Sequence, residues 1–271
     1  MKKLAFLFLM GGLLFFACKD DKPAANGTET EENKPANPLD LSGHWFAMDF
    51  CSRAGQYGSV LGAMNNSHQP YAYAMFFDVE NPDSVRCYNG EESWTLPVSY
   101  NVDTLELKGA KDGKSVFLMY DSQGERGMTM FDGTSGRTRT TAFMKSKANA
   151  ANAYMAFATA LNHNLLGGMF VQAGGGRDTI QFTPGGFITN FGPFDRYQIC
   201  TTGDCFVTGS EIDVITMGNS KEPEKRTQFG FRYNTQMDEL SLHRLTPNPS
   251  NDKAVYTVGP VAYTFKRIKS N

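Results

Sequence analysis

From Leu41 onward, apolar side chains alternate with polar ones along most of the chain, with the period of two that is typical of half-buried strands. The clearest run has Phe229, Phe231 and Tyr233 alternating with polar residues or glycine. Turn signals such as Asn81-Pro82-Asp83 separate the runs. Similar runs lie at 44–50, 71–77, 98–107, 116–120, 128–130, 142–144, 180–182, 187–191, 197–199, 212–215, 240–242, 255–258 and 261–265. The pattern predicts an all-β protein.

One segment has a different period. Residues 149–164 are rich in alanine, and Tyr154, Phe157 and Leu161 fall at helical spacing. Gly167-Gly168 follows, which favours the end of a helix. We therefore expect a single amphipathic helix that divides the strands into two groups.

The two groups of strands look like copies of one unit. The first begins Leu41-Ser42-Gly43-His44-Trp45 and the second Leu166-Gly167-Gly168-Met169-Phe170, which share the frame Leu-x-Gly-x-aromatic. They end on Ala142-Phe143-Met144-Lys145 and Thr264-Phe265-Lys266-Arg267, at nearly equal spacing from their starts. The matched ends predict an internal duplication, with a chance match of short frames as the alternative.

The start of the chain has the features of a secretory signal. Lys2 and Lys3 precede an apolar run, 4–16, that is shorter than the roughly 20 residues of a membrane-spanning helix. Cys18 directly follows Ala17, and this junction resembles a bacterial lipoprotein signal, although Phe15 stands where leucine is usual. The resemblance implies cleavage before Cys18 and acylation of that cysteine, for example with palmitate. An ordinary signal with a chance cysteine is the alternative.

The residues after Cys18 refine the expected location. Lys19-Asp20-Asp21 resembles the lysine-plus-acidic tag that directs lipoproteins of some Gram-negative bacteria to the cell surface. The segment up to residue 40 is polar, contains proline and lacks apolar periodicity, as in a flexible tether. The expected location is the outer membrane, held by acylated Cys18, with the folded part on the cell surface.

These boundaries give a complete domain prediction. We expect a signal peptide at 1–17, a tether at 18–40, a first barrel at 41–147, a linking helix at 148–164 and a second barrel at 165–271.

Four cysteines remain after acylation of Cys18, and an oxidising compartment permits three pairings among them. Cys200 and Cys205 flank a plausible hairpin loop, which favours a disulfide between them and leaves Cys51 to pair with Cys87. The alternative is that one pair stays reduced and buried. No Cys-x-x-Cys motif is present, so we expect no metal site.

The duplicated frame is similar to the first strand of lipocalin-like (calycin) domains, which carries Gly-x-Trp. Gly43 and Trp45 match this motif, and Gly168 and Phe170 form a weaker copy. The resemblance implies two small antiparallel up-and-down β-barrels joined by one α-helix. The units are short for a full lipocalin, and the second motif of the family is missing.

In that family a basic residue on the last strand lies over the tryptophan. The resemblance assigns this role to Lys145 in the first unit, and to Lys266 or Arg267 in the second. A cation over an aromatic face stabilises by about 0.5–2 kcal/mol.

The sequence carries no recognisable catalytic motif. A Gly-x-Ser-x-Gly elbow is missing and the four histidines are scattered. Glu91-Glu92 or Glu211 with Asp213 could form a carboxylate pair, and Gly174-Gly175-Gly176-Arg177 could cradle an anion, but a solvated loop and a hairpin tip are the simpler interpretations. We expect a non-enzymatic protein without a cofactor.

Charge and aromatic content limit the ligands. The formal net charge of −2 argues against a nucleic-acid partner, which requires a concentrated basic face. The following aromatic residues could line a barrel interior, either around one small ligand or as a filled core, and the short units favour the filled core: Trp45, Phe187, Phe191, Tyr197, Phe229, Phe231 and Tyr233.

Together these features predict a surface lipoprotein that binds a small hydrophobic molecule or a glycan. The alternative function is an accessory subunit that binds protein partners in an outer-membrane complex. A hydrolase without a recognisable motif is the third hypothesis.

Overall fold

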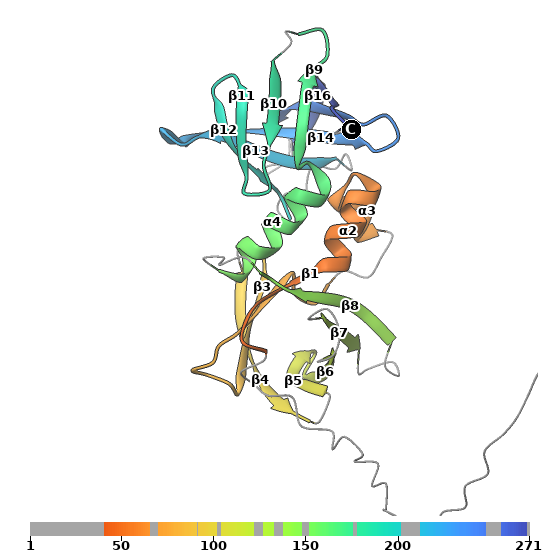
Figure 1. Ribbon diagram of the computed structural model, residues 1–271, viewed down its shortest axis with the longest axis vertical. Coiled ribbons are helices and arrows are strands. Elements are labelled where there is room, and N and C mark those ends of the chain that lie inside the picture. The colour runs from red at the N-terminus through yellow and green to blue at the C-terminus, as the bar shows by residue number, and fades with distance from the viewer. Residues whose placement is uncertain are drawn as a thin grey trace, which may run out of the picture. The chain divides into compact units, whose positions relative to one another are not determined.

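The computed structural model describes most of the chain after residue 40, and these residues form two closed barrels (Figure 1). The described ranges are 41–65, 70–90, 92–101, 104–121, 127–132, 138–147, 152–175, 178–201, 212–247 and 256–269. The all-β prediction with two up-and-down barrels is confirmed. The signal peptide, Cys18 and the tether lie outside the described residues.

The first barrel contains eight antiparallel strands in chain order, and β8 pairs back with β1 to close it. The strands are β1 (Gly43–Ala47), β2 (Ala74–Phe77), β3 (Ser84–Asn89), β4 (Glu92–Tyr100), β5 (Thr104–Lys111), β6 (Lys114–Asp121), β7 (Gly127–Asp132) and β8 (Thr138–Lys145).

Two helices that the sequence pattern missed lie between β1 and β2. The strand predicted for 44–50 ends at Ala47, and α2 (Met48–Tyr57) and α3 (Val60–Asn65) follow. One face of α2 buries Phe50 and Ala54, which are one helical turn apart. The period-two interpretation failed here because a short apolar run fits a strand and a buried helix equally well.

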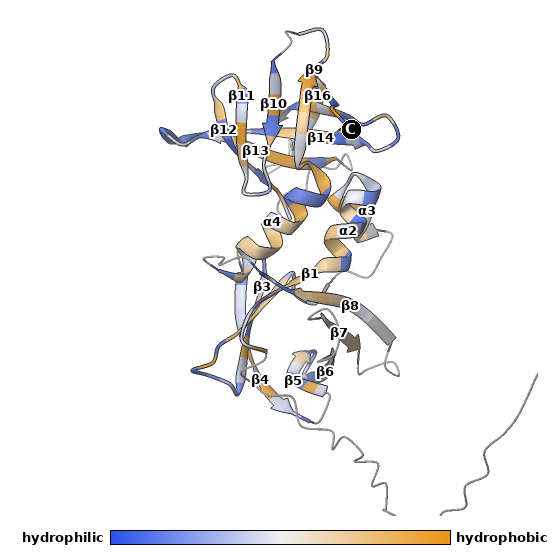
Figure 2. Ribbon diagram, viewed as in Figure 1, coloured by the Kyte–Doolittle hydropathy of each residue, from blue (hydrophilic) through white to orange (hydrophobic). Residues whose placement is uncertain are grey.

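The predicted linking helix is α4 (Ala153–Leu165). Asn152 caps its first turn, because the Asn152 side chain accepts a hydrogen bond from the backbone N–H of Met155 at 2.8 Å. Figure 2 shows α4 as largely apolar. Its Phe157 ring stacks on Tyr73, with ring centroids 4.7 Å apart, and lies 6.2 Å from Phe50 of α2. Helices α2 and α4 thus share one aromatic cluster with the chain entering β2.

Within the described residues, no helix has both the length and the apolar character to span a bilayer.

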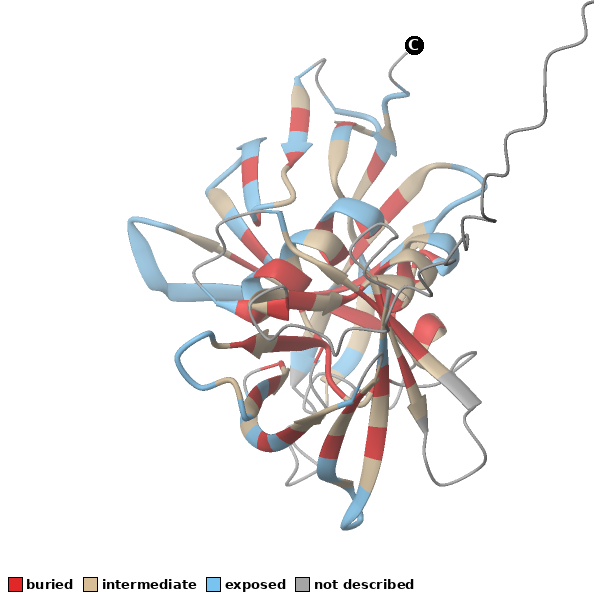
Figure 3. Ribbon diagram, turned by 60° about the horizontal axis from the view of Figure 1, so that its bottom comes forward, coloured by how far each residue is buried: buried red, intermediate tan, exposed pale blue. Residues whose placement is uncertain are grey.

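The second barrel also has eight antiparallel strands, with β16 pairing with β9 to close it. The strands are β9 (Gly168–Gln172), β10 (Thr179–Phe182), β11 (Phe187–Phe191), β12 (Phe194–Ile199), β13 (Asp213–Asn219), β14 (Glu222–Asn234), β15 (Glu239–Pro247) and β16 (Tyr256–Arg267). Buried and more exposed residues alternate along several strands of both barrels, for example β3 and β12 (Figure 3).

The strand registers of the two barrels agree at the repeated frames. Gly43 pairs with Phe77 on β2, as Gly168 pairs with Phe182 on β10. Trp45 pairs with Lys145 in the first barrel. In the second barrel the equivalent pair is Phe170 and Arg267. The repeated sequence frames therefore occupy equivalent positions at the closure of each barrel.

Candidate functional site

Most of the predicted lining residues lie inside the barrels and pack against one another. Phe191 meets Phe265 edge to face at 5.1 Å, and Phe229 meets Tyr263 at 6.0 Å. Burial raises the pKa of Tyr197, whose hydroxyl donates to the Thr183 carbonyl at 2.7 Å. Aromatic contacts of this kind pack the described interior of the second barrel, as expected for a barrel of eight strands. Trp45, Phe191, Tyr197, Phe229 and Phe231 are all buried.

Phe187 does not line the interior, and this part of the prediction is wrong. Its side chain is 45% exposed on the outer face of β11, while Ile188 and Phe191 are buried. The pairing of β11 with β12 shifts register between Phe187 and Phe191. A bulge of this kind turns part of a strand to the opposite face. The guanidinium of Arg196 lies 3.7 Å from the centre of the Phe187 ring.

Both barrels place a cation over the aromatic residue of the repeated frame. The Lys145 ammonium lies 5.9 Å from the Trp45 ring centre, and the Arg267 guanidinium lies 5.1 Å from that of Phe170. Arg267 also lies 5.0 Å from the half-buried Tyr233 ring. Of the two cations predicted for the second barrel, Arg267 takes this position and Lys266 is exposed.

The structure has a cleft on the outer face of the second barrel, with a volume of about 420 Å³. Its floor and walls come from β12, β13, β14 and the turn before β11, which are neighbours in the barrel (Figure 1). The side chains that supply its polar groups are Arg196, Gln198, Thr216, Asn219, Ser220 and Arg226. A smaller cavity of about 260 Å³ adjoins it beside α4 and shares Gly185 and Gly186.

One wall of the cleft is the Gly185-Gly186 turn. Gly186 has a φ of +81°, and a Cβ there would lie 2.9 Å from the carbonyl oxygen of Tyr197. Glycine therefore lets the turn approach β12 closely, where the Tyr197 N–H donates to the Gly186 carbonyl at 2.8 Å. The turn lies against β12 as a fixed edge of the cleft.

The floor of the cleft follows from the strand register. One row of cross-strand pairs runs from β11 to β14. Phe187 pairs with Arg196 on β12, Arg196 pairs with Gly218 on β13, and Gly218 pairs with Arg226 on β14. Cross-strand partners project from the same face of a sheet, so the two arginine side chains stand on either side of a position without a side chain. Gly218 therefore lies between the two arginines in the lining of the cleft.

The opposite wall is the turn between β13 and β14. Asp195 accepts hydrogen bonds from the backbone N–H of Ser220 at 2.7 Å and from its hydroxyl at 3.0 Å. The Nε of Arg196 donates to the same hydroxyl at 2.7 Å. Asn219 donates to the Pro193 carbonyl at 2.7 Å. These bonds hold the turn and the Arg196 side chain in place.

The other candidate groups from the sequence do not form a second site among the described residues. Asp213 is buried, and its Oδ1 accepts from the backbone N–H groups of Val60 and Leu61 at 3.0 and 2.9 Å. It therefore caps α3, while its proposed partner Glu211 lies outside the described residues, as do Glu91 and Arg177. No group of three or more His, Cys, Asp or Glu side chains gathers in the described ranges.

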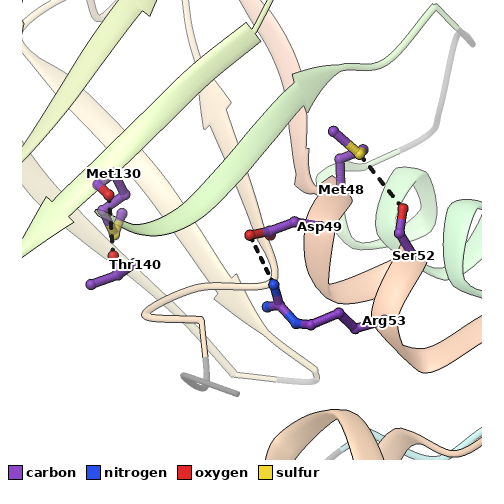
Figure 4. A network of polar contacts seen from close by, with 6 residues as sticks. All are labelled: Met48, Asp49, Ser52, Arg53, Met130 and Thr140. Carbon is purple, nitrogen blue, oxygen red and sulfur yellow. Dashed lines mark hydrogen bonds and ion pairs between the residues drawn. The ribbon is translucent and has the colours of Figure 1, made fainter. Parts of the chain in front are cut away.

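The polar contacts at α2 also have a local role (Figure 4). Arg53 donates to Asp49 at 3.1 Å, one helical turn earlier, and Ser52 contacts the Met48 sulfur at 3.6 Å. Pairs at this spacing stabilise a helix by a few tenths of a kcal/mol. They belong to the helix rather than to a binding site.

The predicted Cys51–Cys87 disulfide is wrong, because both residues are free buried thiols. Burial raises the pKa of Cys51 and raises that of Cys87 to about 12. Cys51 lies in α2, where its sulfur faces the Phe157 carbonyl at 4.0 Å. Cys200 is disulfide-bonded, but Cys205 lies outside the described residues, so their pairing stays a prediction.

Sequence reasoning missed the cleft and its two arginines. Polar residues on the outer face of a strand look alike in the sequence whether they line a cleft or a convex surface. One sequence signal could have indicated the cleft. Pro184-Gly185-Gly186 stands directly before a predicted strand, and such a turn often allows two backbone segments to approach closely. Comparison with protein-family models, curated proteins and solved structures found no match to this chain.

Proposed function

We propose that this protein is a lipid-anchored binding module of the outer membrane, exposed on the cell surface and without catalytic machinery. Acylated Cys18 holds it to the membrane, and the tether of residues 18–40 carries the two barrels. The cleft over Gly218 binds the ligand.

The cleft is the observation that supports this proposal. Ligand sites in proteins typically have volumes of about 300–1,000 Å³, and this cleft falls within that range. The aromatic packing inside the second barrel disfavours a ligand there. Because the lining of the cleft is rich in hydrogen-bonding side chains, a glycan fits it better than a small hydrophobic molecule does.

The ligand proposal is tested with the full chain, solubilised in detergent, on a glycan array and by native mass spectrometry. Gly218→Leu fills the cleft, since an added Cβ there makes only ordinary contacts at 3.6 and 3.7 Å. Thr189→Leu, on the outer face of β11 and outside the cleft lining, is the matched control. We expect the wild type and Thr189→Leu to bind a saccharide and Gly218→Leu to lose it. Equal binding by Gly218→Leu would contradict the cleft as the site.

The anchor is tested separately by Cys18→Ala. Two or more acyl chains bind a membrane stably, at about 0.8 kcal/mol per buried CH₂ group. The variant should therefore move from the membrane fraction to the soluble fraction. Retention in the membrane would contradict acylation at this position. Protease treatment of intact cells tests exposure on the surface.

The second candidate function is an accessory subunit of an outer-membrane complex. The aromatic packing inside the second barrel and the exposed side chains of Met169, Phe187 and Val261 favour it. Chemical cross-linking in whole membranes separates the two functions. A reproducible outer-membrane protein partner, together with no saccharide binding, would favour the accessory role.

A further inference from the structure

We propose that the cleft selects saccharides that carry a carboxylate, which Arg196 and Arg226 recognise together. This inference rests on the proposed glycan-binding function and assigns the chemical class of the ligand.

The described lining of the cleft has positive charge and no carboxylate. Arg196 and Arg226 are its charged residues, and neither forms an ion pair with a carboxylate of the described residues. The neighbouring Asp195 accepts two hydrogen bonds from Ser220. Because neither guanidinium forms an ion pair among the described residues and the cleft lining itself holds no carboxylate, an anionic ligand complements the cleft.

Each arginine is held through the Nε atom of its guanidinium group. The Nε of Arg196 donates to Ser220 Oγ at 2.7 Å, and the Nε of Arg226 donates to the Pro223 carbonyl at 3.1 Å. Phe187 further fixes Arg196 by stacking at 3.7 Å. The terminal amino groups of each guanidinium remain for the ligand, and their fork matches the two oxygens of a carboxylate. Fixing the arginines in advance lowers the entropy cost of binding.

The register sets the spacing between the two arginines. Arg196 and Arg226 flank Gly218 in one row, so their backbones lie two strand spacings apart, about 9.5 Å. In the next row Gln198 pairs with Thr216 and projects to the same face. Uncharged hydrogen-bonding groups thus lie beside the two cations. This arrangement suits sugar hydroxyls next to an acidic group.

The experiment titrates the full chain in detergent with digalacturonic acid and with galactobiose, its neutral counterpart, by isothermal calorimetry. We expect digalacturonic acid to bind at least tenfold more tightly. Arg196→Gln and Arg226→Gln should each weaken its binding about tenfold and weaken galactobiose binding by a clearly smaller factor. Arg232→Gln, on the same strand as Arg226 but outside the cleft lining, is the matched control and should behave as the wild type.

The outcomes separate this inference from the proposed function. Equal affinity for the two disaccharides would overturn the carboxylate preference and leave glycan binding intact. Failure to bind either of them, together with an empty glycan array, would overturn the proposed function and the inference with it. Inorganic phosphate that binds as tightly as digalacturonic acid would show a general anion site, which also overturns the inference.

Discussion

At the scale of single residues, Arg267 joins three segments at the closure of the second barrel. Its terminal nitrogens donate to the carbonyls of Gly167 and Leu165 at 3.2 and 3.1 Å, and its guanidinium lies beside Phe170 and Tyr233. One side chain therefore holds the last strand to the first strand, to β14 and to the end of α4.

Arg267→Ala should lower the free energy of unfolding by about 2–3 kcal/mol, because it removes two charge-assisted hydrogen bonds and the contacts with two aromatic rings. Arg267→Lys should recover only part of the loss, since an ammonium lacks the planar fork. Urea denaturation measures both. Lys266→Ala, at the exposed neighbouring position, should change the stability by less than about 0.5 kcal/mol. Equal losses for Ala and Lys at position 267 would contradict this role.

Gly58 is a second residue that the fold depends on, because only glycine fits at its position. It ends α2 with a φ of +65°, and a Cβ there would overlap the carbonyl oxygen of Tyr233 in the second barrel. The residue therefore needs both a left-handed backbone and a missing side chain.

Gly58→Ala should destabilise the chain by about 2–4 kcal/mol, through backbone strain and overpacking together. Gly174→Ala is the matched control, because Gly174 also has a positive φ, +72°, but no atom of the described residues would lie within 4 Å of a Cβ there. It should cost only the strain, about 1 kcal/mol. Chemical denaturation compares the two variants, and equal losses would show that the contact with Tyr233 is unimportant.

At the scale of elements, α3 depends on a residue of the other barrel. The helix has six residues and is too short to be stable by itself. Its first N–H groups donate to Asp213 on β13, so the second barrel caps a helix that belongs to the first. Burial raises the pKa of the Asp213 carboxyl above its ordinary value, and the hydrogen bonds from the Ser59 side chain and from the backbone of α3 offset only part of this effect.

Asp213→Ala should destabilise the chain by about 1–2 kcal/mol, since it removes the cap. Asp213→Asn keeps an acceptor oxygen and should lose less. The free energy of unfolding should also depend on pH differently in the wild type and in Asp213→Asn. A carboxyl with a raised pKa in the folded state favours folding when protonated, so stability falls as the pH rises through the interval between the unfolded and folded pKa values.

Thermal unfolding measured from pH 4 to pH 7 tests this prediction. The wild type should lose stability relative to Asp213→Asn over the lower part of that range, and the difference should then level off. A constant difference between the two proteins at every pH would contradict the raised pKa of Asp213.

At the scale of the whole molecule, the helices connect the two barrels through buried contacts. Phe50, Tyr73 and Phe157 form one cluster from α2, the chain before β2 and α4. Asp213 and Tyr233 of the second barrel meet α3 and Gly58 of the first. We therefore expect the barrels to unfold together in one transition. Differential scanning calorimetry should give equal calorimetric and van't Hoff enthalpies. Two resolved transitions would show that the barrels unfold independently.

The sequence determined the elements that depend on local pattern. Alternating apolar residues and turn signals were sufficient for the β class, and the repeated Leu-x-Gly-x-aromatic frame indicated both barrel starts. Equivalent registers at Gly43 and Gly168 agree with that duplication. A local pattern suffices here because strand faces and turns follow from neighbouring residues.

The tertiary structure decided the features that depend on distant partners. The register of β16 against β9 places Arg267 over Phe170 and leaves Lys266 exposed, although the two are adjacent in the sequence. Residues after Ala47 form a helix because their apolar face packs on α4. The cleft exists because three paired strands bring Arg196 and Arg226 to either side of Gly218. A sequence pattern encodes which face a residue occupies, but it does not encode which residue lies beside it on the next strand.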